Sequence, residues 1–162
     1  MEDLDFMEEA LRLAREAAAE GEVPGGCGIV RKGEIVGRGR NRREKDKTAL
    51  AHAEIEAIGE ACRNLGGWRL WECTLYVTLE PCPMCAGAII NARIPRVVYG
   101  ASDRKFGACR SVCSLFDMSF NHHPPVEAGV GEEAAAALMT EFFRNLRVEL
   151  RSRPKWRKPE DN

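Results

Sequence analysis

Two short motifs carry the most distinctive chemistry in this sequence. The first is His52-Ala53-Glu54, and the second is Pro81-Cys82-Pro83-Met84-Cys85. Two cysteines three residues apart project to one side of a helix's first turn, so they can share a metal ion. A helix N-terminus also lowers thiol pKa values and so favours the thiolates that bind metal. Because imidazole and thiolate ligands together favour zinc, the spacing predicts a zinc site formed by His52, Cys82 and Cys85.

Glu54 indicates the reaction. Three protein ligands leave the fourth position of a zinc ion open for water, which is typical of catalytic sites, and zinc lowers the pKa of that water toward about 7. A nearby carboxylate can then move the water's proton to a ring nitrogen and a leaving amine. Within a helix, His52 and Glu54 would point in nearly opposite directions, so they converge only if His52 lies where the helix begins. The pattern predicts hydrolytic deamination of an amidine-like ring carbon, with Glu54 as the proton shuttle.

A structural zinc site or a redox cysteine pair would account for less of the pattern. A closed structural site, with Cys73 or Cys109 as fourth ligand, gives Glu54 no role. A redox Cys-x-x-Cys pair leaves His52 without one. Cys109 and Cys113 suggest a second metal pair, but no histidine or acidic cluster lies beside them at ligand spacing. We therefore favour the catalytic interpretation.

Composition limits the class of protein that carries these motifs. The chain has 162 residues, 44% hydrophobic and 30% charged, with a net charge of −1, which fits a single globular domain with a sizeable core. No apolar stretch approaches the roughly 20 residues that cross a bilayer, and the N-terminus is acidic, unlike a secretory signal. Seven cysteines without such a signal favour free thiols and a cytoplasmic location.

Hydrophobic periodicity predicts the elements that must position the motifs. Helices are expected over residues 4–20, 53–62, 84–92 and 132–151, and strands over 27–30, 34–36, 74–79, 96–99 and 126–130. Residues 38–48 are expected to form a loop. Alternating strands and helices predict an α/β domain with helices packed on a mixed sheet. We expect one domain over residues 1–153 and a flexible, basic tail over 154–162.

The net charge conceals two basic segments, residues 31–47 and 144–158. Basic stretches on an otherwise neutral chain suggest a polyanionic partner such as RNA. The alternative is that these charges only keep an exposed face solvated. From charge alone, we favour this alternative.

The two motifs together match the zinc deaminase signature. The wider sequence resembles the bacterial tRNA adenosine deaminases over roughly residues 6–147. The resemblance lies in Glu22-Val23-Pro24, Ala51-His52-Ala53-Glu54-Ile55, residues 75–87, residues 96–100, Asn121-His122 and Phe142-Phe143-Arg144. It implies a three-layer cytidine-deaminase-like fold with about five strands. It also implies a homodimer that converts the wobble adenosine of a tRNA anticodon to inosine.

The resemblance assigns roles position by position. His52, Cys82 and Cys85 would bind one Zn²⁺, and Glu54 would shuttle protons. Asn41 would hydrogen-bond the flipped-out nucleotide. Further contacts to the anticodon strand and the flanking nucleotides would come from Asp103, Lys105, Phe143 and Arg144.

The sequence departs from that family around the expected pocket. Residues 48–51 read Thr-Ala-Leu-Ala where the family usually has Asp-Pro-Thr-Ala, Arg40 precedes Asn41 where an aromatic residue is usual, and residues 25–28 are rich in glycine. An alternative therefore stays open: a deaminase of a free nucleobase or nucleoside, such as guanine or cytosine, with the same zinc site. A third class, a noncatalytic zinc-stabilised RNA-binding module, leaves Glu54 without a role.

Overall fold

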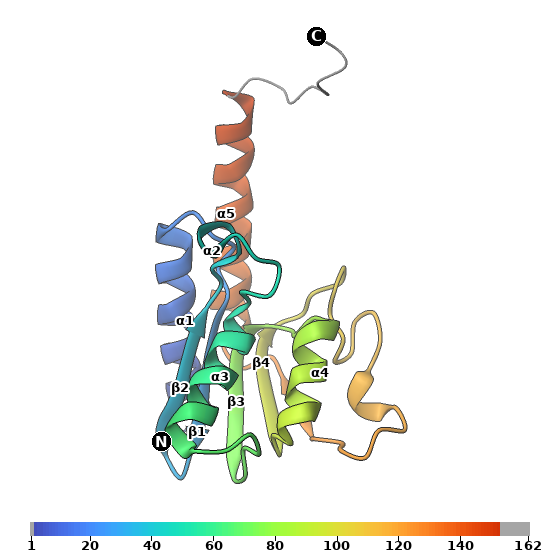
Figure 1. The fold of residues 1–162 in the computed structure, drawn as a ribbon. Coiled ribbons are helices and arrows are strands. Elements are labelled where there is room, and N and C mark those ends of the chain that lie inside the picture. Colours follow the sequence, from blue (N-terminus) through green and yellow to red (C-terminus); the bar gives the residue numbers. More distant parts are fainter. Residues whose placement is uncertain (1, 153–162) are drawn as a thin grey trace, which may run out of the picture.

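The computed structural model describes residues 2–152 and has three layers, with a mixed five-stranded sheet between two pairs of helices (Figure 1). The strand order is β2-β1-β3-β4-β5. The strands are β1 (Gly26–Arg31), β2 (Glu34–Arg40), β3 (Cys73–Leu79), β4 (Arg96–Ala101) and β5 (Val126–Ala128). No helix within residues 2–152 is long and apolar enough to span a membrane.

The direction of the strands determines where loops gather. β1 runs antiparallel to both β2 and β3, whereas β3, β4 and β5 run parallel to one another. The β1–β2 hairpin turns through Lys32 and Gly33, whose φ angles of 51° and 79° are typical of a tight hairpin turn. Because β3 and β4 are parallel, their carboxyl ends meet at one edge of the sheet, and the segments that follow both strands lie there.

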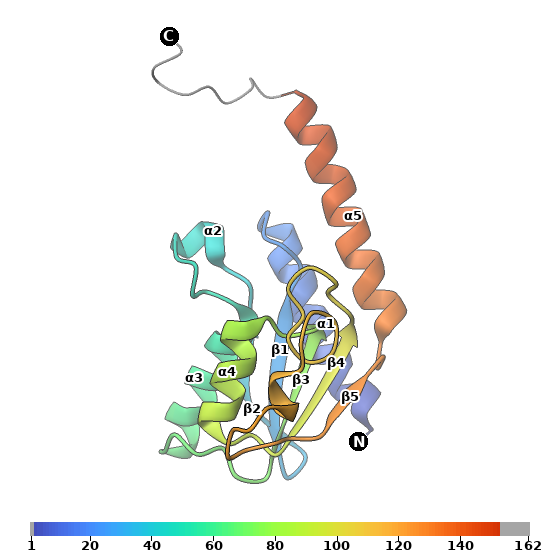
Figure 2. The ribbon, with the colours of Figure 1, turned by 90° about the vertical axis from the view of Figure 1, so that its right-hand side faces the viewer.

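Each face of the sheet is covered by two helices. α3 (Ala53–Leu65) and α4 (Pro83–Ala92) cover one face, where Ala57 and Ile89 pack with Leu75 and Val97. α1 (Asp3–Ala19) and α5 (Glu132–Arg151) cover the other, where Met7 and other residues of α1 pack against the sheet. The C-terminal half of α5 extends beyond the sheet (Figure 2). Its first half supplies that helix's share of the core.

Two glycines let helices approach the sheet closely. A Cβ at Gly39 in β2 would lie 2.1 Å from the carbonyl oxygen of Ala53, the first residue of α3. A Cβ at Gly26 in β1 would lie 1.9 Å from the carbonyl oxygen of Ala10 in α1. Both distances are far below van der Waals contact, so α1 and α3 rest directly on the backbone of the sheet.

The structure confirms the predicted α/β class, the mixed sheet of five strands and the longer helices, within a few residues at their ends. Residues 38–40, expected in the loop, belong to β2, because glycines and arginines alternate there between the face toward α3 and the face toward α1. The predicted ends of two strands are also wrong, since β4 continues past residue 99 to Ala101 and β5 ends at Ala128 instead of residue 130. A short helix, α2 (Arg43–Asp46), and a 3-10 turn, η1 (Leu115–Asp117), were not predicted. The tail over residues 154–162 lies outside the described residues.

Candidate active site

Two helix starts meet at the edge where β3 ends. His52 is the N-cap residue of α3 and Cys82 is the N-cap residue of α4, and both have extended backbone conformations. Pro83 occupies the first turn of α4, where its missing N–H costs no hydrogen bond. The prediction that His52 lies where its helix begins is therefore confirmed.

Three metal-ligating side chains gather at this junction. The donor atoms of His52, Cys82 and Cys85 lie within 4.8 Å of one another. His52 Nδ1 lies 3.6 Å from Cys82 Sγ and 3.5 Å from Cys85 Sγ. Around a tetrahedral zinc ion, with bonds of about 2.0 Å to nitrogen and about 2.3 Å to sulfur, ligand atoms lie about 3.5 Å apart. The type and the spacing of these donors thus fit a zinc ion.

The protonation of the cluster favours a thiolate. A hydrogen bond from the Cys85 thiol, together with His52, lowers the pKa of Cys82 to about 4. The hydrogen bond between Cys85 and Cys82 raises the pKa of the Cys85 thiol. A second hydrogen bond, between His52 and Cys82, raises the pKa of the His52 imidazole. Negative charge therefore concentrates on Cys82 at the N-terminus of α4, where the helix dipole stabilises it.

Glu54 lies beside the cluster in the first turn of α3. It is one of the few buried charged residues, 7% exposed, and its charge contributes to the raised pKa of the neighbouring Cys85 thiol. Burial raises the pKa of its carboxyl above the ordinary value. A buried carboxyl next to a donor set of this kind can both accept and return a proton.

The predicted substrate-binding residues do not all lie at one place. Asn41 and Phe143 line one pocket of about 560 Å³, together with Glu22, Val23, Arg43, Glu44, Phe142 and Leu146. Asn41 also stabilises the local turn, because its side chain donates to the Val23 carbonyl and accepts from the Arg43 N–H. Arg144 is exposed on α5 and does not line this pocket.

Asp103 and Lys105 lie elsewhere, on the segment that follows β4. The Asp103 side chain accepts hydrogen bonds from the backbone N–H groups of Lys105 and Phe106. It therefore shapes the turn, while the Lys105 side chain is exposed.

The two basic segments differ in the structure. In the first, carboxylates of α1 and its C-cap pair with three cations: Arg38 with Glu9, and both Arg40 and Lys45 with Glu20. Lys32 and Arg42 also pair, with Glu72 and Glu56, so five of the eight cations of this segment have carboxylate partners within residues 2–152. In the second, Arg144, Arg147 and Arg151 are exposed, and within residues 2–152 no ion pair involves them.

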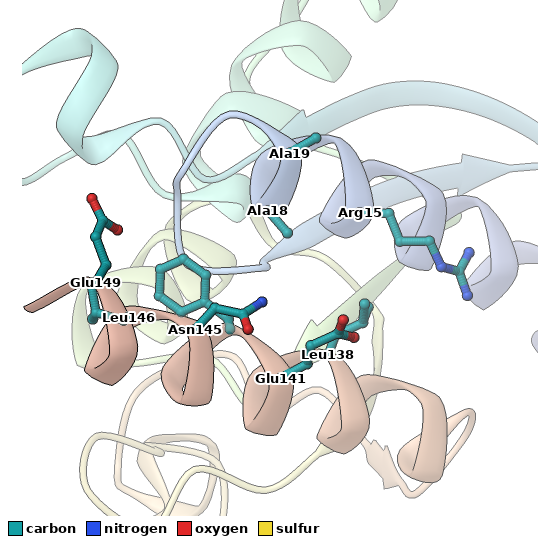
Figure 3. A pocket seen from close by; sticks show the side chains of 9 residues that line it. Arg15, Ala18, Ala19, Leu138, Glu141, Asn145, Leu146 and Glu149 are labelled. Atoms are coloured by element: carbon teal, nitrogen blue, oxygen red, sulfur yellow. The ribbon is translucent and has the colours of Figure 1, made fainter. Parts of the chain in front are cut away.

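A separate hollow of about 540 Å³ lies between α1 and α5 (Figure 3). Apolar side chains that include Ala18, Leu138 and Leu146 line it, together with the charged side chains of Arg15 and Glu141. None of its lining residues belongs to the His-Cys-Cys cluster, so this hollow is distinct from the candidate active site.

Two buried carboxylates were not predicted from the sequence. Glu22 is 1% exposed and accepts the backbone N–H groups of Glu44 and Lys45 at the start of α2. Glu80 is 2% exposed and accepts hydrogen bonds from the segment after β4. The sequence could have indicated Glu80, because an acidic residue there stands between a predicted buried strand and the Pro81-Cys82 turn.

Comparison with known proteins places this geometry in a family. The model of the MafB19-like deaminases matches residues 1–147. The chain belongs to this family. It is therefore a deaminase, a hydrolytic enzyme, and the predicted class of reaction is confirmed.

Individual relatives agree with the assignment. The deaminase is 48% identical over 143 residues to a tRNA-specific adenosine deaminase of Bacillus subtilis, which covers 88% of this chain and 89% of the relative. It is similar, with a TM-score of 0.80 and 45% identity, to a solved structure from studies of A-to-I editing by tRNA:A34 deaminases, over 83% of this chain and 98% of the other. This similarity confirms the cytidine-deaminase-like fold. A guanine deaminase of Nitrosomonas europaea is 25% identical, with a TM-score of 0.73, over 86% of this chain and 83% of the other.

Proposed function

We propose that this deaminase converts the wobble adenosine of a tRNA anticodon to inosine, with one zinc ion bound by His52, Cys82 and Cys85. The observation that carries the proposal is the cluster of these three side chains beside Glu54, in a chain 48% identical to a tRNA-specific adenosine deaminase. The relatives that act on guanine are more distant, at about 25% identity.

The chemistry divides between the cofactor and the chain. When bound, zinc supplies the Lewis acidity that activates a water molecule for attack. The Glu54 carboxylate takes a proton from this water and gives it to N1 of the adenine ring. It then assists the departure of the amine as ammonia, so adenine and water yield hypoxanthine and ammonia. Burial of Glu54 keeps its carboxylate away from bulk solvent.

We propose that the substrate contacts come from the predicted residues. Asn41 and Phe143 share a pocket, which supports contacts of these two residues with the flipped-out nucleotide and its neighbours. None of the pocket's lining residues belongs to the His-Cys-Cys cluster, so these contacts would lie outside the metal site. Lys105 is exposed on the segment after β4, and Asp103 shapes that segment. The exposed Arg144 lies on the basic end of α5, whose arginines form no ion pair within residues 2–152 and therefore suit a phosphate backbone.

We also propose that the enzyme works in the cytoplasm as a homodimer. Its seven cysteines are free thiols, which a reducing compartment maintains. Exposed apolar side chains of Val112, Met118 and Phe120 lie on the segment between β4 and β5 and offer contact area to a second copy. Sedimentation equilibrium is expected to give twice the chain mass, and a monomer at micromolar concentration would exclude this assembly.

The deciding experiment offers the zinc-loaded protein an anticodon stem-loop with adenosine at the wobble position. Free adenosine, cytidine, cytosine and guanine are offered in parallel, and inosine is expected only in the stem-loop. Turnover of a free base with an untouched stem-loop would support the alternative, a small-molecule deaminase.

A matched pair of variants tests the role of Glu54. Glu54→Gln is expected to reduce kcat by about 10²- to 10⁴-fold while zinc content stays near one per chain. Glu56→Gln changes the same group two residues away on α3, where Glu56 pairs with Arg42 at 3.7 Å, and is expected to keep full activity. Loss of zinc in Glu54→Gln would mean that Glu54 is a ligand, not a proton shuttle.

A further inference from the structure

The buried carboxylate of Glu80 has no part in the chemistry proposed above. Glu80 is 2% exposed and lies directly after β3, two residues before Cys82. A buried carboxylate is costly unless hydrogen bonds satisfy it, so its partners indicate what it does.

All five hydrogen bonds to the Glu80 side chain come from one loop. Oε1 accepts the Asp103 N–H at 3.1 Å and the hydroxyl of Ser111. Oε2 accepts the N–H groups of Cys109, Arg110 and Ser111 at 3.1, 2.9 and 3.0 Å. These donors lie at the two ends of the segment 103–111, so the carboxylate joins both ends of the loop.

The loop is also shaped around this carboxylate. A Cβ at Gly107 would lie 2.3 Å from Glu80 Cδ, so only glycine fits there. The backbone on either side of the carboxylate is bonded as well, since the Glu80 N–H donates to the Ala101 carbonyl and the Ala108 N–H donates to the Pro81 carbonyl, both at 2.8 Å. The turn that leads to Cys82 and the loop after β4 therefore form one hydrogen-bonded unit.

The outer side of this loop carries groups suited to a nucleic acid. Lys105 is exposed, and Phe106 next to it is 65% exposed. A cation suits a phosphate, and an exposed ring suits stacking against an unpaired base. Both residues lie between the two ends that Glu80 joins.

We propose that Glu80 is a positioning residue, which holds the loop 103–111 so that Lys105 and Phe106 face the RNA next to the metal ligands. This inference rests on the proposed function. A merely structural role for Glu80 would alter stability alone, whereas a positioning role alters the affinity for the stem-loop.

The test compares three variants of the zinc-loaded full chain. Glu80→Gln places an amide where the loop presents only donors, and Ser111→Ala removes one donor from the loop side. Ser114→Ala is the matched control, because its hydroxyl donates to Asp117 at 2.7 Å instead of to Glu80. We expect KM for the stem-loop to rise about 10-fold in Glu80→Gln and roughly 3-fold in Ser111→Ala, with kcat within about 2-fold of wild type. Ser114→Ala is expected to match the wild type.

A second readout requires no activity. Trypsin cleaves after Arg104 and Lys105, inside the loop, and we expect faster cleavage there in Glu80→Gln and Ser111→Ala at an unchanged rate of global unfolding. Unchanged KM and cleavage in both variants would overturn the proposal. A fall in kcat with loss of zinc at unchanged KM would also overturn it, because Glu80 would then support the metal ligand Cys82 and not the RNA-facing loop. Wild-type protein inactive on the stem-loop would instead refute the proposed function itself.

Discussion

Replacing Gly39 by alanine is expected to damage the fold and the active site together. The new Cβ would lie 2.1 Å from the Ala53 carbonyl oxygen and 2.7 Å from the Ala57 nitrogen. Both are backbone atoms, which no change of rotamer can move aside. The first turn of α3 must therefore shift by about 1 Å to restore ordinary contact, and overpacking of this kind costs roughly 1–3 kcal/mol. For a domain of this size that corresponds to a melting temperature lower by about 3–10 °C.

The same shift reaches the chemistry, because His52 and Glu54 lie on that turn. A displacement of about 1 Å at a catalytic group can lower activity by about 10²-fold. We therefore expect Gly39→Ala to lose most of its activity on the stem-loop and part of its zinc affinity even at temperatures where it stays folded. Thermal unfolding, zinc content and kcat of the purified variant measure the three effects.

Gly28→Ala is the matched control. Gly28 lies in the neighbouring strand β1, its φ is outside the left-handed region, and a Cβ there meets no atom within 4 Å. Both variants lose the same backbone freedom in the unfolded chain, so the difference between them isolates the clash. We expect Gly28→Ala to be more stable than wild type by about 0.5 kcal/mol and fully active. If Gly39→Ala melted as high as Gly28→Ala and kept its activity, the close approach of α3 to β2 would be refuted.

Three further predictions test other parts of the molecule. Cys82→Ser is expected to lower both zinc content and melting temperature, because ligand binding contributes to folding; a variant with full zinc would exclude Cys82 as a ligand. Truncation after Arg147 is expected to weaken stem-loop binding and to reduce its dependence on salt, and an equal salt slope would show that this basic end only solvates a surface. Asp3 is held by Arg96, which lowers the pKa of its carboxyl to about 2. Asp3 therefore stabilises the fold above pH 3.8, its ordinary value, and this contribution is lost as the pH falls through 2. Asp3→Asn should lower the free energy of unfolding by about 1 kcal/mol at pH 7, after allowance for solvent screening, with the gap closing between about pH 4 and 2 in urea titrations.

The candidate metal site was predictable because its geometry is local. The position of His52 as a helix cap follows from its separation from Glu54, and the spacing of Cys82 and Cys85 defines one face of a single turn. Within the two motifs, neighbouring residues determine the direction of each side chain. Only the contact between the two helix starts had to come from the fold.

The role of Glu80 was not predictable in this way. Its donors are mostly backbone N–H groups, of residues 103 and 109–111, and every residue type except proline carries such a group. The residue types in the loop therefore do not show that its backbone binds the Glu80 carboxylate. The ion pairs of the first basic segment were not predictable for a related reason, because Arg38 and its partner Glu9 are 29 residues apart in the chain. Residue charge is visible in a sequence, but its neutralisation by tertiary contacts is not.

The two outermost strands have a consequence for self-association. An open strand edge offers unpaired N–H and C=O groups to other chains, and natural sheets protect such edges with charges or with very short strands. β2 carries Arg38 and Arg40, which pair with Glu9 and Glu20, and β5 has only three residues. Extension of the sheet from one molecule into the next is therefore disfavoured at both ends. A second copy of the chain must be met by a helical layer or by loops, and concentrated solutions should resist the edge-to-edge growth that produces β-aggregates.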